Sequence, residues 1–177
     1  TILWSWHIWS TDYNPDEGFD VYSGHEDIRM MNRNLGALDS APGEGSIGLI
    51  YEWGRKDPFM GSSSLTSYVQ FGVTCTFPDC KTSTSTIGTE QYAVEHPTQY
   101  IIANSQNQDW LYISNSQAWS SEKSIYDPCP SGWKVPDGGS DCVWSSFPST
   151  MSTTNGVTWD STNRGISVSS SLCSNLT

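Results

Sequence analysis

Three histidines are the side chains best suited to acid–base chemistry in this sequence, and each has a structural explanation. His7 lies in an aromatic run, where we expect a hydrogen-bonded core or rim residue. His96 follows a predicted helix, whose C-terminal dipole favours a cation. His25 is expected in a solvated loop. Because no serine-hydrolase, zinc-protease, phosphate-loop or dinucleotide motif is present either, the sequence predicts no catalytic residues and no enzymatic activity.

Oxygen ligands gather in an acidic stretch near the start of the sequence. Its spacing resembles the first half of a calcium-binding loop, but Gly18 comes one place late for an EF-hand, and Ser23 stands where the bidentate glutamate belongs. An acidic turn built from Asx and proline residues is the alternative. Calcium is the one cofactor that the sequence suggests, and its candidate ligands are Asp12, Asn14, Asp16 and Asp20.

Aromatic side chains offer the more plausible binding chemistry. The chain has nine Trp, eight Tyr and five Phe in 177 residues, more tryptophan than one small core needs. Sugars and apolar surfaces stack on such rings, and three of them lie in a polar stretch: Trp110, Tyr112 and Trp119. We predict that these three contribute a ligand-recognition surface. Packing of each ring in the core is the alternative.

Five cysteines, at positions 75, 80, 129, 142 and 173, do not fit a zinc site. Cys75 and Cys80 form the only close pair, and no histidine lies near them. In a chain rich in Ser, Thr and Trp and poor in Lys, we expect disulfides formed in an oxidising compartment. Cys75 can pair with Cys80, and Cys142 with Cys173, which leaves Cys129 over. Five free thiols are the alternative.

The charge balance excludes several partners. Nineteen acidic against eight basic side chains give a net charge of −11, which repels nucleic acid and anionic membranes alike. The nearest approach to a basic patch is Arg55-Lys56, which we expect to be a solvated surface pair. No apolar run approaches the roughly 20 residues of a membrane span, and no signal peptide is visible. The chain is therefore expected to be a processed product or a fragment.

The length suits one domain over residues 1–177 with a core of its own. A strand is expected at residues 2–9, and a second at 28–35, where a short helix is possible. A glycine- and proline-rich loop is expected to lead into residues 49–53. A Ser/Thr-rich surface insertion with little regular structure is predicted at about 61–88. A helix should follow, capped by Thr89 and ended by Pro97.

The second half of the chain alternates core and turn signals. Residues 100–102 and 110–113 are apolar and expected in the core. Residues 125–136 contain closely spaced prolines and a glycine, which predict a rigid turn leading into a short strand with Trp133 and Val135 on one face. The Ser/Thr-rich tail after residue 145 is expected to form loop or edge strand.

Three ordered motifs resemble the Fibrobacter succinogenes major paralogous domain, which occurs in fimbrillin-like and other surface proteins of Bacteroidetes. They are Met31-Asn-Arg-Asn-Leu-Gly-Ala37, Tyr51-Glu-Trp-Gly-Arg-Lys-Asp-Pro-Phe59 and Tyr126-Asp-Pro-Cys-Pro-Ser-Gly-Trp-Lys-Val-Pro136. The resemblance covers nearly the whole chain. The residues that carry the structural motif are Trp53, Gly54, Asp57, Pro58, Cys129, Pro130, Gly132, Trp133 and Pro136.

The resemblance implies an α+β, C-type-lectin-like fold with short antiparallel strands, one or two short helices and long loops. It further implies a non-catalytic, extracellular adhesion module at the bacterial outer surface, recognising a host glycan or protein. A structural domain that accepts a strand from a pilus subunit is one alternative, and an enzyme like the formylglycine-generating enzymes is a second. Family members usually extend further with C-terminal strands, which implies that residues 2–9 pair with a missing segment and that its cysteine partners Cys129.

Overall fold

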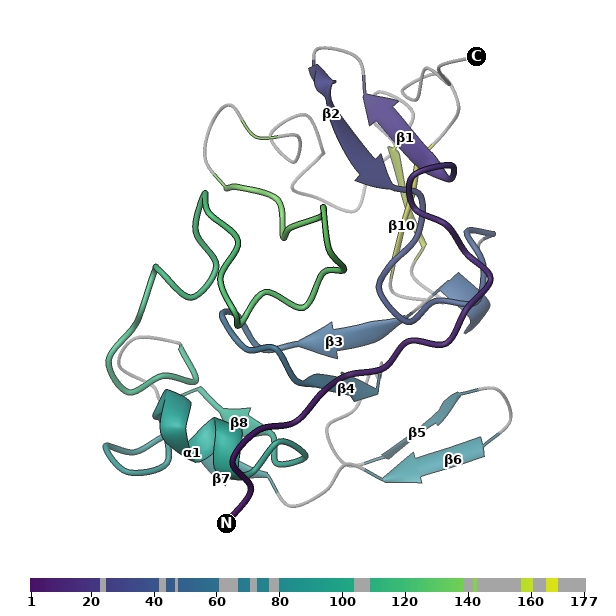
Figure 1. Cartoon of the computed structure of the whole chain (residues 1–177). Coiled ribbons are helices and arrows are strands. Elements are labelled where there is room, and N and C mark those ends of the chain that lie inside the picture. Colours follow the sequence, from purple (N-terminus) through teal and green to yellow (C-terminus); the bar gives the residue numbers. More distant parts are fainter. Residues whose placement is uncertain are drawn as a thin grey trace. The chain divides into compact units, whose positions relative to one another are not determined.

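The computed structural model describes most of the chain as short elements joined by irregular segments (Figure 1). The described residues are 1–22, 25–41, 44–46, 48–60, 67–70, 73–76, 80–103, 109–138, 142, 157–160 and 165–168. They fall into two compact units. Unit 1 comprises Thr1–Trp9 and Leu49–Val135, and unit 2 comprises Ser10–Gly48 and Pro136–Thr177. The single-domain organisation remains a prediction.

The described residues of unit 1 form three two-stranded sheets. Their strands are short, so each sheet buries little by itself and depends on the surrounding loops for its packing. The antiparallel pairs are β3 (Leu49–Tyr51) with β4 (Pro58–Met60) and β5 (Ser67–Gln70) with β6 (Val73–Thr76). The parallel pair is β7 (Lys81–Thr82) with β8 (Ile101–Ile102).

The predicted helix is confirmed as α1 (Glu90–Glu95). The Thr89 hydroxyl accepts a hydrogen bond from the backbone N–H of Tyr92 at 3.1 Å, which satisfies one of the free donors at the helix start. Glu90 adds a negative charge in the first turn, where the dipole favours it. His96 is the C-cap, directly before Pro97, so the local signals in the sequence set both ends of this helix.

The core of unit 1 forms around α1 and β8. Ala93, Ile101, Trp110 and Leu111 are each no more than 4% exposed, and Ile87 and Tyr92 pack against them. The prediction that residues 100–102 and 110–113 return to the core holds for Ile101, Trp110 and Leu111. Ile102, Tyr112 and Ile113 are exposed instead, at 38%, 44% and 81%.

Unit 2 contains two antiparallel hairpins and one turn of 3₁₀ helix. Its elements are β1 (Phe19–Tyr22) with β2 (His25–Met31), β9 (Val157–Asp160) with β10 (Gly165–Val168), and η1 (Glu44–Ser46). The strand predicted at 28–35 therefore begins and ends earlier in the sequence. His25 is the first residue of β2 and not a loop residue. The tail after residue 145 contains a hairpin, within the predicted range of loop or edge strand.

Two predictions about strands were wrong. Residues 2–9 are not assigned to a strand, and Figure 1 draws this stretch as a tube without an arrow. Their β-branched and aromatic composition favours an extended chain, but a strand also needs a neighbour to pair with. The predicted insertion, in contrast, contains the β5–β6 hairpin. At the coarse level the fold is mixed α+β with short strands in small sheets. No helix among the described residues has the length and apolar character of a membrane span.

Candidate functional site

The densest group of functional side chains lies in the turn between β3 and β4. The exposed fractions of Glu52, Arg55, Lys56 and Asp57 are 6%, 2%, 8% and 4%. The prediction that Arg55 and Lys56 are a solvated surface pair is therefore wrong. Their neighbours in sequence include two acids, which neutralise both cations and make burial tolerable. The sequence did contain a signal for this burial: two acids and two bases stand close together between the apolar residues Tyr51 and Phe59.

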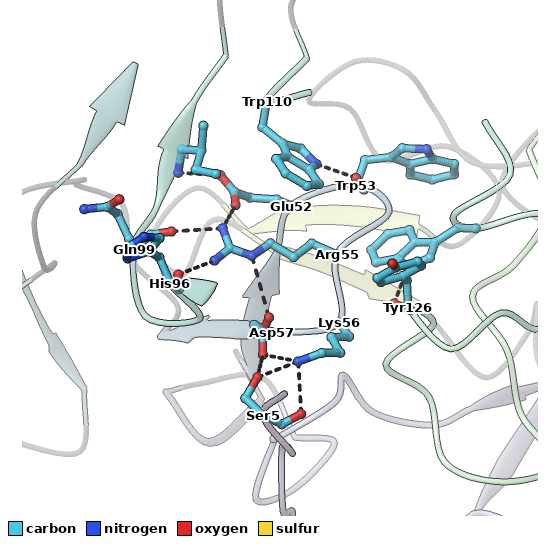
Figure 2. Close-up of polar contacts among 12 residues, drawn as sticks. Ser5, Glu52, Trp53, Arg55, Lys56, Asp57, His96, Gln99, Trp110 and Tyr126 are labelled. Atoms are coloured by element: carbon cyan, nitrogen blue, oxygen red, sulfur yellow. Dashed lines mark hydrogen bonds and ion pairs between the residues drawn. The ribbon is translucent and has the colours of Figure 1, made fainter. Parts of the chain in front are cut away.

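Arg55 ties this turn to the end of α1 (Figure 2). Its guanidinium donates to the Glu52 carboxylate and to the backbone carbonyls of Gln99 and His96, both at 2.9 Å. The other oxygen of Glu52 accepts the backbone N–H of Ile101 at 2.8 Å. Burial raises the pKa of Glu52, and the neighbouring Arg55 opposes that rise. The pair thus fixes the β3–β4 turn against the helix exit and β8.

Lys56 and Asp57 tie the same turn to the N-terminal segment (Figure 2). The Lys56 ammonium donates to the Asp57 carboxylate at 2.7 Å, to the Ser5 carbonyl at 3.0 Å and to the Ser5 hydroxyl. The Ser5 hydroxyl in turn donates to Asp57. The ammonium also lies 4.5 Å from the centre of the Trp4 ring, a cation–π contact.

Ser5 and Lys56 have the side-chain types of a serine–lysine nucleophile pair, but their hydrogen bonds are structural. Asp57 also holds the Lys56 ammonium in an ion pair. A small pocket lies beside this pair, and its lining includes Gly54, Glu90 and Tyr126.

The proline-rich turn at 125–136 is held by a second buried carboxylate. Asp127 is 9% exposed and accepts hydrogen bonds at 2.8 Å from the Lys123 ammonium and from the backbone N–H groups of Cys129 and Val135. Gly132 takes a positive φ of 83°, which favours glycine. The predicted rigid turn is confirmed, but the short strand predicted to follow it does not form.

The N-terminal segment, residues 2–8, presents three of its large apolar side chains to solvent almost completely. Leu3 is 85% exposed, Trp6 80% and Ile8 84%. Between the last two, His7 turns inward, and its Nδ1 lies 3.1 Å from the Tyr51 hydroxyl. Burial lowers the pKa of His7, partly offset by the charge of Asp57. The prediction of a hydrogen-bonded rim residue at His7 is confirmed.

The three predicted ligand-binding aromatics do not form one exposed face. Trp110 is 4% exposed and donates its indole N–H to the Trp53 carbonyl at 2.6 Å, so it is a core residue. Trp119 is half-buried and donates to the Tyr126 carbonyl at 2.8 Å. Tyr112 is 44% exposed. The exposed tryptophan of this region is Trp53, at 50%, which rests edge-on against Trp119 with ring centres 5.0 Å apart.

The predicted calcium ligands lie in and beside the turn before β1. The Asn14 side-chain oxygen accepts the backbone N–H of Asp16 at 3.1 Å, and its carbonyl accepts from Gly18 at 2.9 Å. These are the bonds of the Asx turn that the sequence offered as the alternative. Burial raises the pKa of Asp20. Among the described side chains, no group of three or more His, Cys, Asp or Glu is arranged to hold a metal ion.

The predicted disulfides lie partly outside the described residues. The side chains of Cys75 and Cys173 are not described, so the pairs Cys75–Cys80 and Cys142–Cys173 remain predictions. Cys129 is a free thiol in unit 1. Burial, followed by the nearby Asp127 carboxylate, raises its pKa to about 12, so it is protonated and weakly nucleophilic at neutral pH.

Unit 1 therefore combines buried polar turns, a small pocket and an exposed apolar segment. Comparison with models of protein families, with curated proteins and with solved structures finds no match to this chain.

Proposed function

We propose that this chain is a non-catalytic binding module of a bacterial cell-surface or pilus-associated protein. The observation that carries the proposal is the exposed apolar row of residues 2–8. Apolar side chains gathered on one exposed stretch mark interaction sites in soluble proteins. The row contains Leu3, Trp6 and Ile8, each at least 80% exposed.

The polar side chains of unit 1 support a binding role over a catalytic one. Ser5, Lys56 and Asp57 are bonded to one another, and Glu52 and Asp127 each accept from several donors. These bonds engage the groups that a catalytic base or nucleophile would need free.

The bacterial surface location and the lectin-like fold rest on the sequence. The three motifs of residues 31–37, 51–59 and 126–136 resemble a domain of Bacteroidetes surface proteins. Disulfides at Cys75–Cys80 and Cys142–Cys173 would fit export. Intact mass under non-reducing conditions tests them, because each disulfide removes a pair of hydrogens. A fully reduced mass after purification from an oxidising compartment counts against export.

The binding role is tested by applying the purified chain to arrays of host glycans and of extracellular host proteins. A variant with Leu3→Ser, Trp6→Ser and Ile8→Ser removes the apolar row. Ile125→Ser is the matched control, because Ile125 is 70% exposed in the same unit but lies outside the row. Binding by the wild type and the control, lost in the triple variant, is the expected result. Equal binding by all three proteins contradicts a role for the row.

A further inference from the structure

Residues 5–8 show the side-chain alternation of a strand that lacks its neighbour. Ser5 and His7 point inward and Trp6 and Ile8 outward, whereas Trp4 also lies inward, so the alternation begins only at Ser5. No backbone–backbone hydrogen bond joins these residues to the rest of the described chain, although the Ser5 carbonyl accepts a bond from the Lys56 ammonium. Unpaired N–H and C=O groups along an extended apolar stretch are a template for an added strand.

Inward side chains hold this segment in place. Ser5 bonds to Lys56 and Asp57, and His7 contacts the Tyr51 hydroxyl. The Trp4 ring lies 6.2 Å from the ring of Tyr126 and stacks on the Lys56 ammonium. A partner therefore meets a segment that is already extended and anchored, and loses less conformational entropy on binding.

The negative charge of the chain favours some partner strands over others at residues 2–8. Unit 1 has eight acidic and five basic side chains, and three of the basic ones are in ion pairs with buried acids. The whole chain carries −11, so a second copy of it would be repelled as it approached. A positively charged partner is attracted by the same field.

We infer that residues 2–8 bind an extended strand of another protein, apolar on alternate positions and flanked by Lys or Arg. The inference rests on the proposed binding function and names the kind of partner. The strand forms main-chain hydrogen bonds with the segment, and its apolar side chains lie across from Trp6 and Ile8 as cross-strand pairs.

Four synthetic peptides test this. The first alternates Val and Thr over nine residues, with two lysines at each end. The second replaces the lysines with glutamates. The third and fourth keep the lysines and carry N-methyl groups on the odd or the even residues, which removes the hydrogen-bond donors on one edge of the strand at a time. Binding of each peptide to the purified chain is measured by fluorescence anisotropy at low and at high salt.

We expect the lysine peptide to bind at least tenfold more tightly than the glutamate peptide at low salt, with the gap narrowing at high salt. One of the two methylated peptides should lose at least tenfold in affinity. The Leu3→Ser, Trp6→Ser, Ile8→Ser variant should not bind, whereas Ile125→Ser should bind normally. Equal affinity for all lysine peptides, methylated or not, overturns strand pairing.

Two further outcomes separate this inference from the proposed function. If the chain binds arrayed glycans or proteins through the apolar row but binds none of the peptides, the strand partner is wrong and the binding module stands. If sedimentation at increasing concentration gives a dimer that the triple variant does not form, the segment pairs with a second copy, and the basic partner is wrong.

Discussion

The turn of residues 52–57 and the segment of residues 2–8 belong to the same unit but distribute their side chains in opposite ways. The turn buries four charged groups, each at most 8% exposed, whereas the segment exposes three large apolar ones at 80% or more. In most proteins charged side chains are exposed and large apolar ones are buried, so both regions depart from the usual distribution. The buried charges are neutralised in pairs and hydrogen-bonded, which accounts for the turn. The exposed row has no such compensation within the described residues.

This contrast indicates different roles for the two regions. Buried ion pairs that connect β3, β4, α1 and the N-terminal segment hold unit 1 in one arrangement. Removing one partner leaves a buried charge uncompensated. The apolar row contributes little to that arrangement, because its side chains contact mainly solvent. Mutations should therefore separate stability, which depends on the turn, from binding, which depends on the segment.

The largest expected loss of stability is for Arg55→Met. It removes the donor to Glu52 and to two backbone carbonyls, so the free energy of unfolding should fall by about 3–5 kcal/mol. Urea unfolding followed by tryptophan fluorescence measures it. Glu52→Gln combined with Arg55→Met should recover part of the loss, because the buried carboxylate is gone. Glu122→Gln, at an exposed acid, is the control and should change stability by less than about 0.5 kcal/mol. An equal change for Arg55→Met contradicts the structural role of the turn.

Gly54→Ala should have the next largest effect. Gly54 has a φ of +80°, and a Cβ there would lie 2.8 Å from the Cβ of Ala118. Gly132 is a matched control, since its φ is +83° and an added Cβ meets nothing within 4 Å. Gly132→Ala should therefore cost about 1 kcal/mol from the backbone alone, and Gly54→Ala about 2–3 kcal/mol, in the same urea assay. Equal losses would mean that the contact with Ala118 relaxes freely.

The sequence predicted correctly those features that depend on residues close together in the chain. Thr89, Glu90 and Pro97 lie within one short stretch and define α1 correctly, and the prolines with Gly132 define the turn near 130. Burial of Arg55 depends on carbonyls of His96 and Gln99, more than 40 residues away in sequence, so it was missed.

For the candidate site too, the predictions failed where a residue's environment depends on distant parts of the chain. Trp110 was named as a ligand residue because its neighbours are polar, whereas its burial depends on Trp53 and on the cluster around Ala93. The strand expected at 2–9 failed for the same reason: composition predicts an extended chain, but pairing depends on a distant segment. The exposure of Leu3, Trp6 and Ile8 could only be seen once the fold was known.

Removing the apolar row should hardly change the stability of the chain. The Leu3→Ser, Trp6→Ser, Ile8→Ser variant removes side chains that are at least 80% exposed, so the free energy of unfolding should change by about 0.5 kcal/mol or less. Solubility should rise, because an exposed apolar stretch promotes association. Urea unfolding and light scattering at increasing concentration measure the two quantities. A loss of about 2 kcal/mol or more is what a substitution in the core costs. Such a loss would mean that the row stabilises the fold, and it would contradict a role in binding.

The smallest effect should be a pH dependence at His7, where the two regions meet. Burial lowers the pKa of His7 in the folded chain below its ordinary value of 6.5. Between those two pKa values the unfolded chain binds more protons, so stability falls as the pH drops from above 6.5 through the folded pKa. Asp57 opposes the effect by attracting the proton, which keeps the effect small. In the doubly protonated ring, Nδ1 can only donate to the Tyr51 hydroxyl.

His7→Gln removes the titration while keeping a side chain that can bond to Tyr51. The difference in unfolding free energy between pH 7.5 and pH 5.5 should therefore be smaller in His7→Gln than in the wild type. If the wild type and His7→Gln lose stability equally on acidification, protonation of His7 is not the cause of the pH dependence. The charged turn would then hold residues 2–8 in place without it.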